Sequence, residues 1–177
     1  ENFNAKEWIS LFEDAGAKYI KFQLEKDGLV IFHNGRPFNE KDIEGVCGIA
    51  NGTKEDGTRI GHFGIGFKSV YCYTETPFIY SGDYHFEIKN QLFPEEVPGK
   101  TGLSYSETCM ILPFNKKEVP SHIAYLEIKD ALKKKITAES IMMLNQINDI
   151  DIRIDGDPEQ IHINKKKYPL DSKHAEN

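Results

Sequence analysis

The stretch YIKFQLEKDGLVIF, residues 19–32, carries the strongest structural signal in the sequence. Apolar and polar side chains alternate along residues 19–24, as they do in a strand with one buried face. Residues 29–32 are rich in β-branched and aromatic side chains. The dipeptide Asp27-Gly28 between the two runs is typical of tight turns. This stretch therefore predicts an antiparallel β-hairpin.

Further elements are indicated on both sides of this hairpin. Residues 4–15 predict an amphipathic helix, because apolar residues recur there every three to four positions between a capping Asn4 and a terminating Gly16. Residues 89–106 contain two prolines and two glycines and are expected to form a loop. The other predicted helices cover residues 39–49, 67–73, 123–132 and a segment that starts at 138 after the cap Thr137, and the other predicted strands cover 78–80, 84–88, 109–112, 150–154 and 161–163.

Strands joined by tight hairpins favour a mostly antiparallel sheet, and the interleaved helices favour one covered face. We therefore expect an α+β fold, a two-layer α/β sandwich with helices on one face of a mixed sheet. The 177 residues match one ordinary domain, with motifs in a core at residues 4–115 and a closing helix–strand segment at 116–170. The chain starts at Glu1 without an initiator methionine, so we expect a piece of a larger protein whose other domains are its partners.

Composition excludes several classes of function. The net charge of -6 disfavours direct nucleic-acid binding, and no apolar run approaches the roughly 20 residues that span a membrane. Cys47, Cys72 and Cys109 are isolated from one another, which indicates neither a disulfide framework nor a zinc site. Reduced thiols in a cytoplasmic protein are the expectation.

The stretch IGHFGIGFKS, residues 60–69, points to a ligand. Gly61, Gly64 and Gly66 leave backbone amides uncovered, so a phosphate chain could lie against them at the start of a following helix. The spacing differs from the dinucleotide-binding GxGxxG pattern, and no P-loop GxxxxGK[ST] occurs in the chain. Taken alone, such a run is also common in loops that bind nothing.

Residues 60–69 closely resemble the third motif of the GHKL ATPases, the superfamily of gyrase B, the heat-shock chaperone of the ninety-kilodalton class, histidine kinases and MutL. Residues 29–38, with His33-Asn34-Gly35 at their centre, resemble the second motif, and residues 107–112 resemble the fourth. Residues 49–54 are similar to the segment that precedes the lid of the chaperone. The chain resembles in particular the sacsin-like and chaperone-like bacterial branch.

The resemblance implies a Bergerat-type ATP-binding fold and a domain that binds ATP or ADP. It also implies a set of residues that contact the nucleotide. These residues are Asp14, His33, Asn34, Gly35, Gly61, Phe63, Gly64, Ile65, Gly66, Phe67, Lys68 and Thr108. For Lys68, which could reach a phosphate, a solvent-facing position on the following helix is an equal alternative.

The first motif departs from the family pattern of Glu-x-x-x-Asn on a helix. The glutamate position falls on Glu7, which the resemblance makes the catalytic base, and the asparagine position falls on Leu11. Leucine has no ligand atom, so binding of Mg²⁺ is doubtful and no metal ligand is assigned. A capping role for Glu7, three residues after Asn4, is nearly as well supported.

A second departure is His33, which stands where the family has an aspartate that accepts the adenine amino group. A neutral imidazole nitrogen can accept a hydrogen bond, although more weakly than a carboxylate. The alternative is that His33 only packs at the end of a strand. Only six residues separate Lys54 from Gly61, so the long lid of the chaperone is missing.

The sequence thus predicts an ATP/ADP-binding domain that acts as a nucleotide-dependent conformational switch, with weak or absent hydrolysis in isolation. A non-catalytic nucleotide sensor or interaction module is the main alternative, because Leu11 suggests that the Mg²⁺ chemistry is lost. The catalytic domain of a histidine kinase is less favoured, since the glycine pattern at residues 60–69 resembles that of the chaperone and we expect no dimerisation helices before the domain.

Overall fold

A computed structural model describes residues 3–47 and 67–166 of the chain. The described helices are α1 (Ala5–Asp14), α2 (Glu40–Cys47), the short 3₁₀ helix η1 (Ser69–Cys72), α4 (Ser121–Lys135) and α5 (Ala138–Met142). The strands are β1 (Tyr19–Glu25), β2 (Gly28–His33), β3 (Phe78–Ser81), β4 (Tyr84–Lys89), β5 (Phe93–Glu96), β6 (Thr108–Pro113), β7 (Asp149–Ile154) and β8 (Ile161–Asn164).

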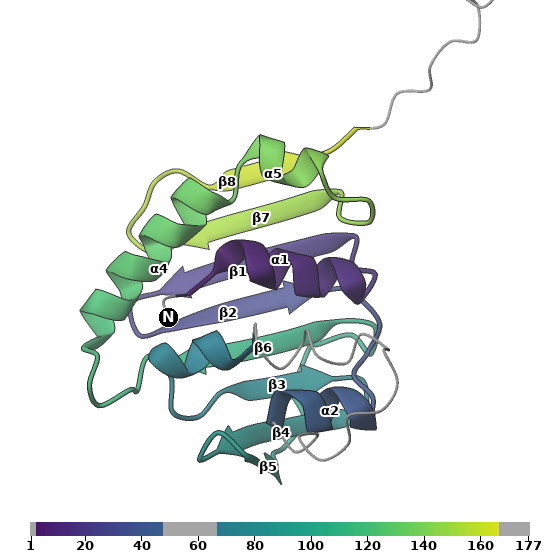
Figure 1. Cartoon of the computed structure of the whole chain (residues 1–177), viewed down its shortest axis with the longest axis vertical. Coiled ribbons are helices and arrows are strands. Elements are labelled where there is room, and N and C mark those ends of the chain that lie inside the picture. The colour runs from purple at the N-terminus through teal and green to yellow at the C-terminus, as the bar shows by residue number, and fades with distance from the viewer. Residues whose placement is uncertain (1–2, 48–66, 167–177) are drawn as a thin grey trace, which may run out of the picture.

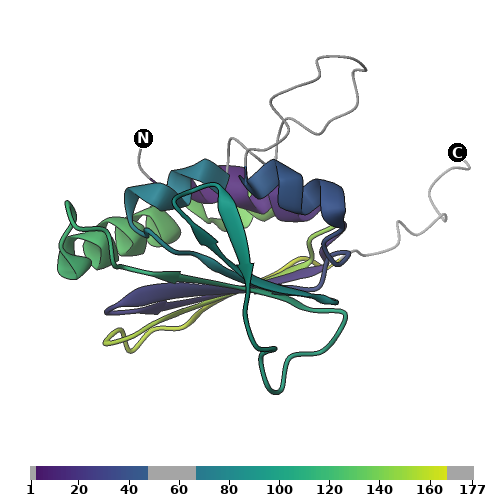
Figure 2. The same cartoon turned by 90° about the horizontal axis from the view of Figure 1, so that it is seen from below.

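The strands form one eight-stranded sheet in the order β5-β4-β3-β6-β2-β1-β7-β8. Neighbouring strands run antiparallel except β1 and β7, which are parallel. The helices lie on one face of the sheet (Figure 2). On that face α1 lies over β1, α4 packs beside α1 and against β1, α5 lies toward β7 and β8, and α2 lies toward β4 and β5 (Figure 1). The predicted α+β class with a mostly antiparallel sheet is confirmed.

The predicted hairpin is β1 and β2, which pair along their length from Ile20 opposite His33 to Glu25 opposite Gly28. The two-residue turn is Lys26-Asp27, one position earlier than the sequence indicated, and Gly28 is the first residue of β2. A side chain on Gly28 would lie 3.2 Å from the Leu112 carbonyl oxygen of β6. The glycine therefore permits the close approach of β6 rather than the turn.

The helix α1 packs its apolar face into the core, as its spacing predicts. Trp8 and Phe12 are fully buried, with ring centroids 5.7 Å apart. Complete burial of an aromatic side chain of this size contributes on the order of 3 kcal/mol. The Trp8 ring also lies 5.8 Å from that of Phe67, and its indole Nε1–H donates to the Ser69 hydroxyl over 3.3 Å. These contacts hold the start of η1 against α1.

On the opposite side of α1, the carboxylate of Glu13 fixes the segment that leads into β7. It accepts hydrogen bonds from the backbone amides of Asn145, Gln146 and Ile147 at 2.5, 2.8 and 3.0 Å. Hydrogen bonds to an ionised acceptor are about twice as strong as neutral ones. The end of α1 is therefore hydrogen-bonded to the segment that enters the β7–β8 edge of the sheet.

The loop prediction for residues 89–106 is wrong over β5, which pairs with β4 along Phe93–Glu96. All four residues are exposed and Pro94 lacks an amide hydrogen, so this edge strand has no alternating pattern to reveal it. The remaining strands lie where the sequence placed them, and Thr137 caps α5 as predicted. Among the described residues, no helix is long and apolar enough to cross a membrane.

Candidate functional site

Three buried polar side chains lie next to one another on the helix-covered face of the sheet. In the strand register His33 of β2 is opposite Thr108 of β6, and Thr108 is opposite Ser81 of β3. Side chains alternate between faces along a strand, so His33 shares its face with the core residues Leu29 and Ile31. We call His33, Thr108 and Ser81 the polar row. It interrupts an otherwise apolar layer at one end of three adjacent strands.

The two hydroxyl groups of the polar row are hydrogen-bonded to each other. Ser81 Oγ and Thr108 Oγ1 are 2.5 Å apart, and Ser81 Oγ also accepts a hydrogen bond from the Phe38 amide at 2.9 Å. Both side chains are completely buried. Two hydroxyls carry two hydrogens, and their mutual bond uses one. Within residues 3–47 and 67–166 the other hydrogen has no acceptor.

His33 is also buried, with 1% of its surface exposed. Its ring lies 4.6 Å from that of Phe12, at an interplanar angle of 30°. Nδ1 accepts a hydrogen bond from the Gly35 amide at 3.1 Å, whereas buried Nε2 has no partner in the described part of the chain. Burial lowers the pKa of His33 from 6.5 to about 4. The imidazole is therefore neutral at physiological pH.

The turn after β2 joins His33 to the end of α1. The Arg36 amide donates to the Ala15 carbonyl oxygen at 2.9 Å, and a side chain on Gly35 would come within 2.9 Å of the same oxygen. Asn34 Oδ1 accepts from the amides of Lys18 and Tyr19, each at 2.9 Å. In the structure Asn34 thus closes the α1–β1 connection, and Gly35 allows the close packing.

An ion pair between exposed Arg36 and buried Asp42 connects this turn to α2. Arg36 donates to both carboxylate oxygens of Asp42, at 2.5 and 2.8 Å, and Asp42 also accepts from the Asn39 amide at 2.9 Å. Burial opposes ionisation of Asp42, but the hydrogen bonds from Arg36 and Asn39 outweigh it and leave the pKa of this carboxyl below its ordinary value. The Asn39 side chain in turn accepts from the Asp42 amide, so the two residues cap the start of α2 reciprocally.

The predicted catalytic residue Glu7 is exposed in the first turn of α1. Its amide donates to Asn4 Oδ1 at 3.4 Å, so Asn4 is the cap of the helix. Glu7 lies five residues before Phe12, about 7.5 Å along the helix axis from the residue that stacks on His33. Leu11, one turn after Glu7, is buried, and Asp14 is exposed at the last position of α1.

The remaining predicted contacts divide into three groups. Phe67 is fully buried. Its ring centroid lies 5.8 Å from that of Trp8 and, edge-on, 6.0 Å from that of Tyr71, so Phe67 packs in the hydrophobic core. Lys68 is exposed immediately before η1. Gly61, Phe63, Gly64, Ile65 and Gly66 lie outside the described residues. Of the predicted set, the structure brings together His33, Gly35 and Thr108.

Sequence reasoning missed Ser81, Phe12 and the Arg36–Asp42 pair as parts of this site. The N-x-x-D pattern at residues 39–42 is a capping signal that could have indicated Asp42. Ser81 is the last residue of β3, before an ordinary turn sequence, and only the register of β3 against β6 shows that it meets Thr108. Local sequence carries no information of that kind.

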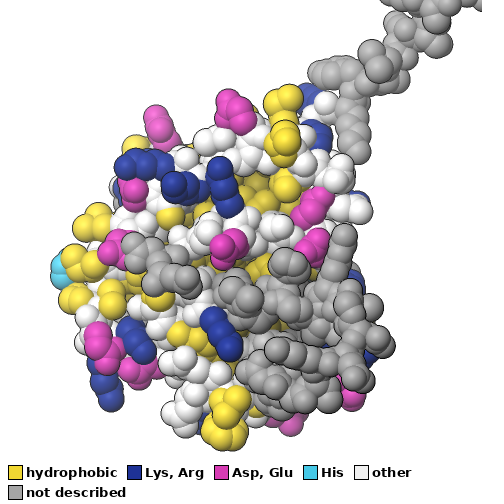
Figure 3. Space-filling model, viewed as in Figure 1, with side chains coloured by type: hydrophobic (Ala, Val, Ile, Leu, Met, Phe, Trp, Pro, Cys, Tyr) yellow, Lys and Arg dark blue, Asp and Glu magenta, His cyan; other side chains and the backbone are white. Residues whose placement is uncertain are grey.

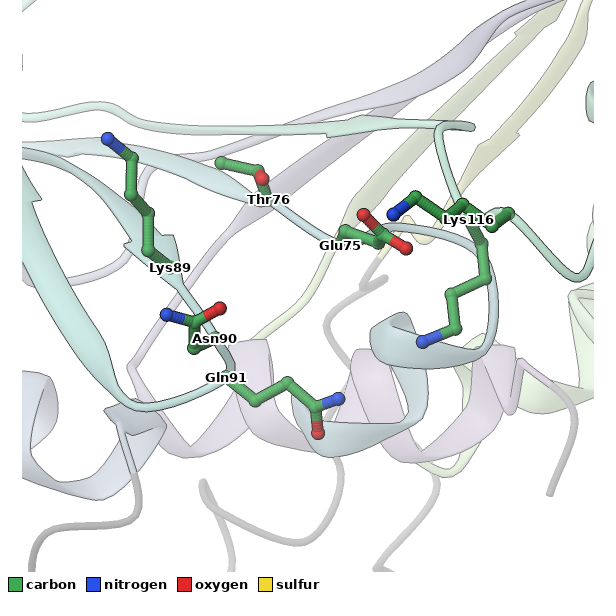
Figure 4. Close-up of a pocket in the computed structure, with 7 residues that line it drawn as sticks. Glu75, Thr76, Lys89, Asn90, Gln91 and Lys116 are labelled. Atoms are coloured by element: carbon green, nitrogen blue, oxygen red, sulfur yellow. The ribbon is translucent and has the colours of Figure 1, made fainter.

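Other surface features are weaker candidates. A pocket of about 450 Å³ lies at the opposite end of β3 and β4, lined by Glu75, Thr76, Lys89, Asn90, Gln91, Lys116 and Lys117 (Figure 4). Its Lys89 is already paired with Glu87 and Glu95. Acidic and basic side chains are interspersed over the helix-covered side of the molecule (Figure 3). No group of three or more potential metal ligands occurs within the described ranges.

Part of the chain is similar to known proteins. Residues 21–90 match the family model of the Sacsin domain. Protein NO VEIN of Arabidopsis thaliana is 38% identical over 70 residues, which are 39% of this chain and 3% of that protein. Sacsin of Homo sapiens is 35% identical over 96 residues, covering 44% of this chain and 2% of Sacsin. These matches support a sacsin-like family, and the aligned regions are a small fraction of either relative.

Replacement of Gly35 tests the packing of the turn. In Gly35→Ala the new methyl group meets the Ala15 carbonyl oxygen at 2.9 Å and His33 Nδ1 at 3.1 Å. We expect the free energy of unfolding, measured by urea denaturation, to fall by about 1–3 kcal/mol. Gly45→Ala is the matched control, because Gly45 lies in α2 with nothing near the added carbon, and it should gain about 0.5–1 kcal/mol. Equal effects of the two changes would contradict the packing described.

The burial of neutral His33 makes stability depend on pH. The unfolded chain protonates His33 below pH 6.5, whereas the native chain does so only near pH 4. The native state is therefore favoured most above pH 6.5 and loses up to about 3 kcal/mol as the pH falls to 4. Urea unfolding at pH 7, 6 and 5 should show a steeper loss for the wild type than for His33→Gln. The exposed His122→Gln should keep the wild-type slope, and equal slopes in all three proteins would refute the claim.

Proposed function

We propose that this sacsin-like chain is a domain that binds ATP and ADP, with the purine base at the polar row beneath α1. The observation that carries the proposal is the buried Nε2 of His33, which has no hydrogen-bond partner among the described residues. A buried polar group without a partner costs about 1–3 kcal/mol, so it is uncommon unless a ligand completes it.

The surroundings of His33 suit a flat heteroaromatic ring. Small-molecule sites are mostly apolar, with a few polar groups that converge on one place. Here the Phe12 ring packs on the imidazole and holds it in an apolar setting, and the Ser81–Thr108 hydroxyl pair supplies a further hydrogen next to His33 in the strand register. At Gly35 the backbone of the turn passes close to the His33 ring, and no side chain fills the space beside it.

In this proposal the phosphates extend toward the segments that the sequence resemblance assigns to them. Gly61, Gly64 and Gly66 would hold the phosphate oxygens through their backbone amides, and exposed Lys68 would add a positive charge. Leu11 has no ligand atom, so Mg²⁺ would be held by phosphate oxygens and water. Bound Mg²⁺ would neutralise phosphate charge there.

Nucleotide at this place would act as a conformational switch for the larger parent chain. The base would contact His33, whose ring packs on Phe12 of α1, and the strands β2 and β6, so occupancy would couple the helix to the sheet. The second candidate function is a nucleotide sensor or interaction module without catalysis. Its support is the burial of Leu11, an apolar residue at the position that binds the metal in the ATPases that the sequence resembles.

The direct test is stabilisation by nucleotide. A ligand that binds only the native state stabilises it by about 2.7 kcal/mol at 100 times its dissociation constant, so both ATP and ADP should raise Tm. Differential scanning fluorimetry and calorimetric titration measure the two quantities. No shift and no heat at millimolar nucleotide in a folded sample would reject the proposal.

The matched variants Thr108→Val and Thr101→Val locate the site within that test. Thr108→Val keeps the shape but removes one hydroxyl of the polar row, and should weaken nucleotide binding about three- to tenfold. Thr101 is exposed in the segment after β5, so Thr101→Val should bind as the wild type does. Equal affinity of the two variants would place the base elsewhere.

Hydrolysis by the isolated domain should be slow. Phosphoryl transfer depends on positioning and on charge neutralisation, and the loss of one such element can cost about 10³-fold. Relative to a median enzyme turnover of about 10 s⁻¹, a loss of this size predicts a turnover number for ATP hydrolysis of about 10⁻² s⁻¹ or less. Steady-state phosphate release is measured for the wild type, Glu7→Ala and the exposed control Glu44→Ala. Turnover near 1 s⁻¹ that disappears only in Glu7→Ala would show a competent ATPase instead.

A further inference from the structure

The hydrogen bond within the turn determines which nitrogen of His33 carries the proton. The Gly35 amide donates to Nδ1 at 3.1 Å, so Nδ1 must present its lone pair. A neutral imidazole has a single ring proton, which is then on Nε2. The buried nitrogen without a partner is therefore an N–H donor, and it cannot accept a hydrogen bond.

This polarity limits what can complete the site. The neighbouring hydroxyl pair has one further hydrogen to donate, but hydroxyl oxygens also accept, so Ser81 and Thr108 tolerate either kind of partner. His33 Nε2 is different, because it is satisfied only by an acceptor. The amino group at position 6 of adenine is a donor and would meet this N–H with the wrong polarity.

We propose that His33 donates its Nε2 hydrogen to N7 of the purine base and makes no hydrogen bond to the group at position 6. This specificity rests on the proposed nucleotide function and extends its ligand class to purine nucleotides with either a 6-amino or a 6-oxo group. On that edge of the base, adenine presents N7 beside a donor and guanine presents N7 beside an acceptor. N7 is the acceptor on that edge that the two bases share.

The first arm of the test compares three nucleotides with the wild-type chain by calorimetric titration. ATP and inosine triphosphate, which carries an oxygen at position 6, should bind within about threefold of each other. Loss of a buried hydrogen bond predicts that 7-deaza-ATP, which has C–H in place of N7, binds about tenfold more weakly or worse. Tenfold rejection of inosine triphosphate, or undiminished binding of 7-deaza-ATP, would overturn the proposal.

A second arm reverses the polarity at position 33. In His33→Asp the carboxylate accepts but does not donate, so it should favour ATP over inosine triphosphate by about tenfold or more. His122→Asp places the same change at an exposed position of α4 and should keep the wild-type ratio. A His33→Asp protein that binds both nucleotides equally would contradict a role for His33 in base selection.

The third arm needs neither ligand nor substitution. Long-range ¹H–¹⁵N correlation spectra of the free wild-type chain distinguish the two imidazole tautomers, and we expect His33 to be protonated at Nε2. Protonation at Nδ1 would overturn the inference by itself. Failure of every purine nucleotide to bind would overturn the proposed function and the inference together, whereas binding of ATP with strong rejection of inosine triphosphate would overturn the inference alone.

Discussion

The hydrogen bond from the Gly35 amide to His33 Nδ1 is the contact on which the arrangement of this site depends. It requires a residue without a side chain at position 35, because a Cβ there would collide with the Ala15 carbonyl oxygen. It holds the imidazole against Phe12 and assigns the proton to Nε2. One short turn thus fixes the position, the orientation and the polarity of the buried histidine.

The same turn makes the site sensitive to the position of α1. At the end of the helix, the Ala15 carbonyl oxygen accepts a hydrogen bond from the Arg36 amide. The Glu13 carboxylate accepts hydrogen bonds from three successive backbone amides before β7. Arg36 continues this connection to α2 through Asp42. A ligand that contacts His33 therefore acts next to Phe12 of a helix that is hydrogen-bonded at its end to the turn after β2 and to the segment before β7. This geometry suits a switch whose output is a small movement of α1.

Periodicity in the sequence was sufficient for most of the fold. Alternation revealed β1 and β7, and the three- to four-residue spacing revealed α1, because each has one face in the core. Strand β5 was not predicted, because all of its residues are exposed and its side chains do not alternate between apolar and polar. In the candidate site, the sequence motifs indicated His33, Gly35 and Thr108. The contribution of Ser81 could not be predicted, because it arises from the register of β3 against β6. The hydrogen bonds that Glu13 accepts could not be predicted either, because they join residues more than a hundred positions apart in the sequence.

A structure of the chain with ADP bound, determined by crystallography, tests the central claim most directly. The account predicts the purine ring beneath α1, beside the polar row, with an acceptor atom of the base about 3 Å from His33 Nε2. The Thr108 hydroxyl should lie at the edge of the same ring. A base bound away from the polar row, with His33 Nε2 still buried and unpaired, would contradict it.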